Sequence, residues 1–219
     1  KMSAALEITG FLLGTASWLV TGTALANDYW KVSSFFGSVI ISNRQYENLW
    51  HSCAEDSSGI AECRDFESLL ALPRFMLACR ALMIISLLLG LFSMVISILG
   101  LKCIKIGSVR EDTKSKIAVT GGILFILASL CSMTAISWYA ARVVQDFNNP
   151  LYGGIKFELG AGLYMGWAGT GLSIIGGSLL CCSCNQWSKG QSKGAYYPPS
   201  QAQKIHKPVS ELEMARAYV

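Results

Sequence analysis

Residues 81–101 read ALMIISLLLGLFSMVISILGL, 21 residues without a charged side chain. Three more uncharged stretches cover residues 8–27, 117–141 and 159–188, which are 20, 25 and 30 residues long. A helix rises about 1.5 Å per residue, so about 20 residues cross a hydrocarbon layer about 30 Å thick. Because lipid cannot satisfy unpaired backbone groups, we expect these stretches to be helical. The sequence therefore predicts four membrane spans, at about 6–27, 79–101, 117–141 and 160–183.

The composition supports this class of protein. Hydrophobic residues make up 52% of the chain and charged residues 15%, whereas an average soluble domain is about 25% charged. Four buried helices of a soluble protein would need a polar shell that the rest of the chain cannot supply. The first span ends in Ala24-Leu25-Ala26, the A-x-A form of a signal-peptidase site. A signal peptide, however, has a charged start and an apolar core of only about 7–15 residues, so we expect an uncleaved helix.

The distribution of basic residues predicts the orientation. Five lysines and arginines against two acids lie in the short loop 102–116, and five more follow the fourth span. By the positive-inside rule both regions are cytoplasmic, which places both chain termini in the cytoplasm. The loops 28–78 and 142–159 are then extracellular. Residues 28–79 carry seven acids and four bases, a net charge of −3.

The first outer loop is too long for a simple connector and has the pattern of a small sheet. Candidate strands cover residues 29–33, 38–42 and 46–51, and a short fourth strand ends at Cys63 after a turn at 56–59. A sheet of this size is marginal in water. Cys53 and Cys63 flank the turn, and in an oxidising exterior a disulfide between them would join the third and fourth strands. Residues 68–72 favour a short surface helix closed by Pro73.

The other chemistry-bearing residues give no catalytic pattern. Only two histidines are present, on opposite sides of the predicted membrane, and no phosphate loop of Walker form occurs, so we expect no enzyme, metal site, cofactor or nucleic-acid partner. Cysteines at the cytoplasmic ends of spans two and four suit palmitoylation. These are Cys103, Cys181, Cys182 and Cys184. Cys181 and Cys184 also have C-x-x-C spacing, which leaves a membrane thiol oxidoreductase as a remote alternative.

The spacing of several residues in the first loop resembles the W…(G/N)LWxxC…C signature of claudins and related four-span proteins. The matching residues are Trp30, Asn48, Leu49, Trp50, Cys53 and Cys63, followed by Arg80 at the mouth of span two. Phe147-x-x-Pro150, residues 156–160 and the terminal Ala217-Tyr218-Val219 are also similar to claudins. The resemblance covers residues 2–187 and the last three residues, and 188–219 is expected to be a flexible cytoplasmic tail. Asn48 stands where many claudins have glycine, and an asparagine there is typical of the channel-forming claudins. Asn148 stands where many claudins have phenylalanine.

The resemblance implies a membrane four-helix bundle, carrying a small extracellular antiparallel β-sheet built from both outer loops. It implies a structural adhesion protein of tight junctions in the plasma membrane, which polymerises with itself and other claudins of the same and the opposing membrane. On this pattern Asp56, assisted by Glu55 and Asp65, would select small permeant cations in a paracellular pore. Leu69 would contact Phe147 of a neighbour.

The tail and the competing families complete the expectations. Tyr218 and Val219 would bind PDZ scaffold proteins of the zonula occludens type, because the peptide adds a strand to the groove and backbone amides hold its carboxylate.

Two alternatives remain within the resemblance. One is a sealing claudin without a pore, and the other is a four-span regulatory subunit of the calcium-channel γ type or a peripheral-myelin-type protein.

Overall fold

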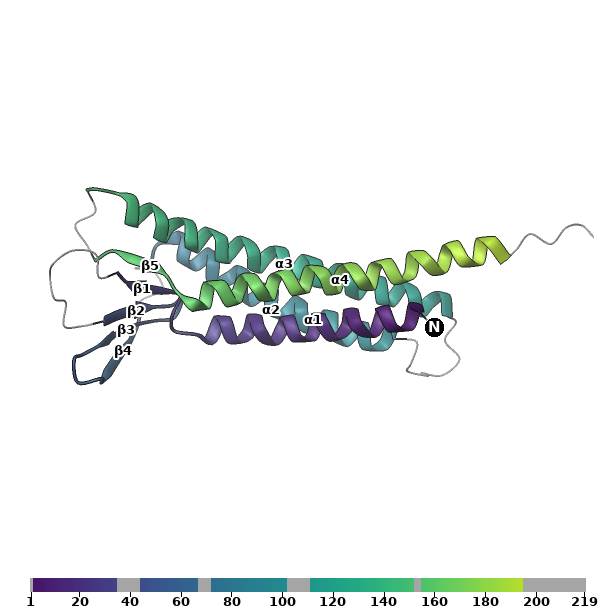
Figure 1. Cartoon of the computed structure of the whole chain (residues 1–219), viewed down its shortest axis with the longest axis horizontal. Coiled ribbons are helices and arrows are strands. Elements are labelled where there is room, and N and C mark those ends of the chain that lie inside the picture. The colour runs from purple at the N-terminus through teal and green to yellow at the C-terminus, as the bar shows by residue number, and fades with distance from the viewer. Residues whose placement is uncertain (1, 35–43, 67–71, 102–110, 152–154, 195–219) are drawn as a thin grey trace, which may run out of the picture. The chain divides into compact units, whose positions relative to one another are not determined.

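The computed structural model of the chain describes residues 2–34, 44–66, 72–101, 111–151 and 155–194. Side chains are described for residues 4–34, 44–66, 72–101, 113–151 and 155–182. Four helices and five strands are present in the described ranges (Figure 1). They are α1 (Met2–Ala26), β1 (Lys31–Ser33), β2 (Arg44–Glu47), β3 (His51–Glu55), β4 (Ala61–Asp65), α2 (Arg74–Gly100), α3 (Glu111–Asn148), β5 (Phe157–Leu159) and α4 (Ala161–Gly194).

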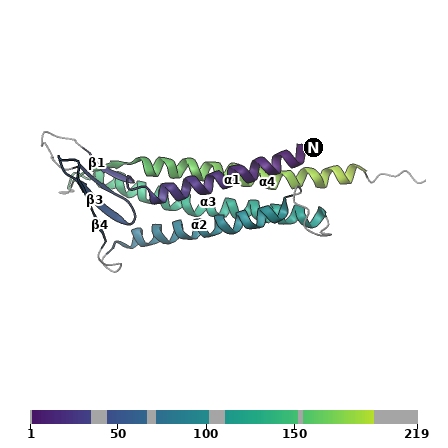
Figure 2. The same ribbon diagram turned by 90° about the horizontal axis from the view of Figure 1, so that it is seen from below.

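The predicted fold class is confirmed. All four helices are long and apolar enough to cross a membrane, over Ala4–Ala26, Arg74–Gly100, Thr113–Asn148 and Ala161–Cys182. The strands form one antiparallel sheet in the order β4-β3-β2-β1-β5. β5 comes from the second loop and pairs with β1 of the first, as expected of a sheet built from both loops. In both views the sheet lies at one end of the bundle and the N-terminus at the other (Figures 1 and 2).

The third predicted strand, residues 46–51, is wrong. The structure has two strands here, β2 ending at Glu47 and β3 beginning at His51, with a tight turn between them. The reason is Asn48, whose side-chain Oδ1 accepts hydrogen bonds from the backbone N–H groups of Trp50 at 2.6 Å and His51 at 2.7 Å. An asparagine that bonds the backbone two and three residues ahead favours a turn over a strand. The predicted strand 38–42 and residues 68–71 of the predicted surface helix lie outside the described residues, and Leu72 is a buried bend residue.

The helices extend beyond the predicted spans. α2 begins at Arg74, directly after Pro73, because proline is tolerated at a helix start but not inside a helix. α3 continues through residues 142–148, which include Arg142, Gln145 and Asp146, and ends two residues before Pro150. The residue before a proline is disfavoured in a helix, and no earlier signal stops this one.

Small residues bring α4 close to its neighbours. A Cβ on Gly122 would lie 2.8 Å from the carbonyl oxygen of Gly177 on α4, and one on Gly10 would lie 2.9 Å from that of Gly176. Such close approach of helix backbones is typical of small residues in membrane spans. Gly171 differs, because nothing lies within 4 Å of the corresponding position.

The described chain divides into two units. Residues 1–186 contain the sheet and the bundle. The buried core cluster of this unit lies where the sheet meets the bundle and includes Trp30, Leu49, Met83, Tyr139 and Leu163. Residues 187–219 form the second unit, of which 187–194 are the helical end of α4.

Candidate functional site

Trp30 joins the first helix to the sheet. It precedes β1, is fully buried, and donates a hydrogen bond from Nε1 to the carbonyl oxygen of Ala24 at 2.7 Å. Its ring meets that of Tyr139 edge to face, with centroids 5.2 Å apart and planes at 87°. A buried indole with its N–H bonded contributes both apolar area and direction, so Trp30 fixes how β1 leaves the bundle.

Asn48 organises the turn that follows β2. Besides accepting the two backbone bonds described above, its Nδ2 donates to Asp28 Oδ1 at 2.9 Å. The side chain is 1% exposed, and the next residue, Leu49, is fully buried in the main core. A buried amide is tolerated where its polar atoms have hydrogen-bond partners. This amide joins the turn to Asp28, two residues after the end of α1.

Arg80 holds this turn from the side of α2. Its Nε donates to the carbonyl oxygen of Leu49 at 2.7 Å, and its guanidinium lies 5.0 Å from the ring centroid of Trp50 and 5.5 Å from that of Phe66. It is 8% exposed. The signature residues Trp30, Asn48, Leu49, Trp50 and Arg80 therefore form one structural unit where the sheet meets the bundle.

The predicted disulfide is present. Cys53 and Cys63 are directly opposite each other on β3 and β4 and are bonded to one another. Cys53 is buried, whereas all five residues of β4 are exposed. The covalent bond holds an edge strand that has no apolar cover of its own, which is how small sheets with little core are stabilised.

The ladder sorts charged side chains onto two faces, because directly paired residues share a face and successive residues alternate. We call the two faces A and B. Face A carries Lys31, Glu47, Glu62 and Arg64. Two ion pairs neutralise it, Lys31 Nζ to Glu47 Oε2 at 2.6 Å and Arg64 Nη2 to Glu62 Oε1 at 3.1 Å.

Face B holds the disulfide and an excess of acids. Its charged strand residues are Arg44, Glu55, Asp65 and Glu158. Three carboxylates against one guanidinium give the described strands of face B a net charge of −2 with His51 neutral. On this face burial, followed by the neighbouring Tyr29 and the Glu55 and Asp28 carboxylates, raises the pKa of the Tyr46 phenol above its ordinary value.

The three predicted selectivity acids lie near one another along the β3–β4 hairpin. Glu55 ends β3, and Asp56 is exposed at the first position of the connecting turn, where its Oδ1 accepts a hydrogen bond from the N–H of Ser57 at 2.6 Å. Asp65 ends β4 and is 85% exposed. Its Oδ1 lies 2.5 Å from Nδ1 of His51, the residue opposite it on β3.

The remaining predicted site residues are placed as follows. Phe147 is half-buried near the end of α3 beside a groove formed with β5 and α4, and Lys156 lies over its ring at 5.4 Å. Cys181 is partly exposed and Cys182 exposed at the end of the fourth span. Leu69, Cys103, the Cys184 side chain, Tyr218 and Val219 lie outside the described residues.

Comparison with known proteins identifies the family. The family model described as "PMP-22/EMP/MP20/Claudin family" matches residues 2–180. The chain belongs to this family. Its relatives include claudins: mouse claudin-15 is 44% identical over 202 residues, which cover 91% of this chain and 89% of the relative. Human claudin-19 is 40% identical over 209 residues, covering 94% and 93%, and mouse claudin-3 is 44% identical over 186 residues, covering 84% of each.

Membership establishes the general role. Claudins are structural membrane proteins of tight junctions, so this claudin is a multi-pass junction protein that associates with other claudins and is not an enzyme. The unit formed by the signature residues is accordingly a support for the sheet. In the described part of the chain no group of three or more histidine, cysteine or acidic side chains is arranged to hold a metal.

Proposed function

We propose that this claudin forms a cation-permeable paracellular pore, and that face B of its sheet contributes the pore wall. The observation that carries the proposal is the sorting of charge. Face A is neutralised by its own ion pairs, whereas face B retains an excess of two negative charges. A permeant ion is attracted by uncompensated charge within about 8 Å, beyond which salt screens the field.

Asp56 remains the principal selectivity residue in this proposal, with Glu55 and Asp65 in support. A carboxylate about 5 Å from a monovalent cation contributes roughly 1 kcal/mol in water and more in a confined pore. Asp56 is exposed at the turn, and Asp65 shares face B with Glu55. Arg64 lies on face A and donates to Glu62 at 3.1 Å, so we expect it to offset the acids of face B less than its position in the sequence suggests.

Orientation and assembly follow the same family pattern. We propose that both termini are cytoplasmic and the sheet is extracellular, because the basic residues gather in 102–116 and after the fourth span. The groove beside Phe147 is lined by Val143, Val144 and Tyr164, which suits an apolar side chain of a neighbouring protomer such as Leu69. Tyr218 and Val219 would bind PDZ scaffolds, and Cys103, Cys181, Cys182 and Cys184 would accept palmitate.

Dilution potentials across a claudin-poor epithelial layer expressing the chain test the pore. Asp56→Asn is a sharp variant, because an asparagine Oδ1 can still accept the Ser57 N–H while the charge is lost. If each site contributes about 1–2 kcal/mol, Asp56→Asn should lower the Na⁺ over Cl⁻ preference by roughly five- to thirtyfold, and Asp65→Asn should lower it less.

Glu62→Gln is the matched control, since it removes an acid from face A of the same hairpin. Strand formation is checked by junctional staining in every line. Equal effects of Glu62→Gln and Asp65→Asn would contradict the assignment of face B. A rise in resistance without ion preference would show a sealing claudin.

A further inference from the structure

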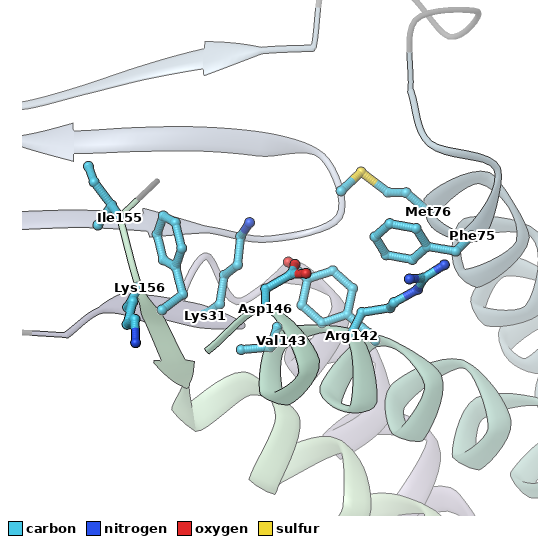
Figure 3. A pocket seen from close by; sticks show the side chains of 10 residues that line it. Lys31, Phe75, Met76, Arg142, Val143, Asp146, Ile155 and Lys156 are labelled. Atoms are coloured by element: carbon cyan, nitrogen blue, oxygen red, sulfur yellow. The ribbon is translucent and has the colours of Figure 1, made fainter. Parts of the chain in front are cut away.

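A small recess lies between the sheet and the bundle, on the side of α3. Figure 3 shows Asp146 between Lys31 and Arg142, with Phe75 and Met76 on one side and Ile155 and Lys156 on the other. The recess has a volume of about 40 Å³. One water needs about 10–15 Å³ of such space, so the recess accommodates about three waters or one small polar group, and not an acyl chain.

The wall of the recess contains a buried hydroxyl without a partner. Tyr139 lines the recess and is 2% exposed, and its hydroxyl makes no hydrogen bond to the part of the chain that the structure describes. Buried polar atoms of proteins are almost always bonded, so an orphan in the wall of a recess points to a group that enters from outside. The hydroxyl can donate to an oxygen of that group.

The rim carries Arg142 and Asp146, which form no ion pair with the residues that the structure describes. The two residues are one helical turn apart on α3. Arg142 is held 5.3 Å from the ring centroid of Phe75. Lys31 is already bonded to Glu47 at 2.6 Å. Side chains at this spacing lie about 5–6 Å apart, so the rim presents opposite charges separated by that distance.

We infer the level of the recess in the membrane from the exposed aromatic residues near it. Trp138 is 44% exposed and precedes Tyr139, and Tyr164 on α4 is 57% exposed, as in the aromatic belt of a membrane interface. Counted along the helix from Tyr139, Arg142 lies about 5 Å further out and Asp146 about 11 Å. The headgroup layer is about 5–8 Å thick on each side of the hydrocarbon, so Arg142 falls within it and Asp146 lies at its outer edge. Val144, 43% exposed between the two charges, keeps an apolar surface at this level.

We propose that this recess binds the headgroup of a zwitterionic phospholipid from the leaflet on the sheet's side of the membrane. The phosphodiester enters, accepting hydrogen bonds from the Tyr139 hydroxyl and the Arg142 guanidinium. The ammonium group lies against the Asp146 carboxylate. A two-carbon linker separates phosphate and ammonium in such headgroups, which suits charges one helical turn apart. The acyl chains stay in the bilayer.

Native mass spectrometry of the full chain in a phosphate-free detergent tests the site. The protein is titrated with dioleoyl phosphatidylcholine, with the matching phosphatidylglycerol, which has the phosphate but no ammonium, and with inorganic phosphate. We expect one tightly retained phosphatidylcholine. Arg142→Gln should weaken retention of both lipids by about ten- to a hundredfold, the range for a charge-assisted hydrogen bond. Asp146→Asn should weaken retention of phosphatidylcholine and leave retention of phosphatidylglycerol unchanged.

Two variants separate binding from structure. Arg74→Gln removes an exposed arginine outside the recess and should leave lipid retention unchanged. Tyr139→Phe should lower phosphatidylcholine retention and reduce the thermal stabilisation that the lipid gives, whereas a purely structural tyrosine would shift stability equally with and without lipid. Wild-type retention of phosphatidylcholine in Arg142→Gln, Asp146→Asn and Tyr139→Phe would overturn the proposal. So would equal retention of both lipids by the wild type, or displacement of the lipid by inorganic phosphate.

Discussion

Arg80→Met removes the side chain that attaches the Asn48–Trp50 turn to the bundle, and its cost can be worked out from the contacts. The substitution deletes a charge-assisted hydrogen bond to the Leu49 carbonyl at 2.7 Å, which is worth about 1.5–3 kcal/mol. It also deletes a cation–π contact with Trp50 at 5.0 Å, worth about 0.5–2 kcal/mol. Part of this loss is offset, because Arg80 Nη2 is buried without a partner in the described part of the chain. We expect a net loss of about 2–4 kcal/mol.

The measurement is thermal unfolding of purified protein in detergent, followed by tryptophan fluorescence. At about 2–4 °C per kcal/mol for a chain of this size, the Tm should fall by about 4–16 °C. The Tm of Arg80→Lys should lie between those of Arg80→Met and the wild type. Lysine keeps the charge and a donor but not the planar group that stacks on Trp50. Limited proteolysis should show earlier cleavage in 28–73 than in the helices.

Arg74→Met is the control for this experiment. Arg74 begins the same helix, is exposed, and should change the Tm by less than about 2 °C. If Arg80→Met and Arg74→Met shift the Tm equally, the guanidinium contacts do not hold the sheet, and the signature arginine acts in some other way.

Other changes test the same framework. Asn48→Leu should lower the Tm by several degrees, because it leaves two turn N–H groups without their acceptor, whereas Asn48→Ser should recover part of the loss. Gly160→Ala should prevent a stable sheet, since a Cβ there would clash with the backbone of Tyr29, and Gly171→Ala, with open space around it, should be neutral in the same unfolding assay. Cys53→Ser should leave four spans inserted but abolish junctional strands, and a normal strand network by freeze-fracture would refute that role for the disulfide.

The spans and the existence of the sheet could be predicted because each depends on one-dimensional patterns. An uncharged run of 21 residues at 81–101 leaves few alternatives to a membrane helix. The Cys53–Cys63 pair likewise indicated a hairpin around residues 56–59, and the structure has it. Helix ends were less predictable, since the segment 142–148 mixes charged, polar and apolar residues and could equally have been a loop by composition.

The turn at Asn48 was missed for a physical reason. Residues 46–51 include Tyr46 and Trp50, aromatic residues that favour a strand, but the Asn48 side chain bonds the backbone ahead of it and bends the chain. Which of these two tendencies prevails depends on burial of Leu49 and on the Arg80 bond to its carbonyl oxygen. Both are tertiary contacts, and the residue types within the segment do not report them.

The contact between His51 and Asp65 was also missed, although the sequence contained a signal for it. If Cys53 is opposite Cys63 in an antiparallel hairpin, then residues two positions before and two after are opposite as well, which pairs His51 with Asp65. The disulfide therefore fixes the register of the whole hairpin. The same step places Arg64 and Glu62 together on face A and away from Asp65.

This sorting changes what the charge of the loop means for ion selectivity. Counted along the sequence, residues 28–79 have a net charge of −3, and Arg64 counts against Asp65 as its neighbour. In the sheet, Arg64 Nη2 is 3.1 Å from Glu62 and Lys31 Nζ is 2.6 Å from Glu47, so these four charges cancel in pairs on face A. The field that a permeant ion meets depends on which face lines its path. A substitution on face B should therefore change selectivity far more than a substitution of equal charge on face A, although both lie in the same few residues of sequence.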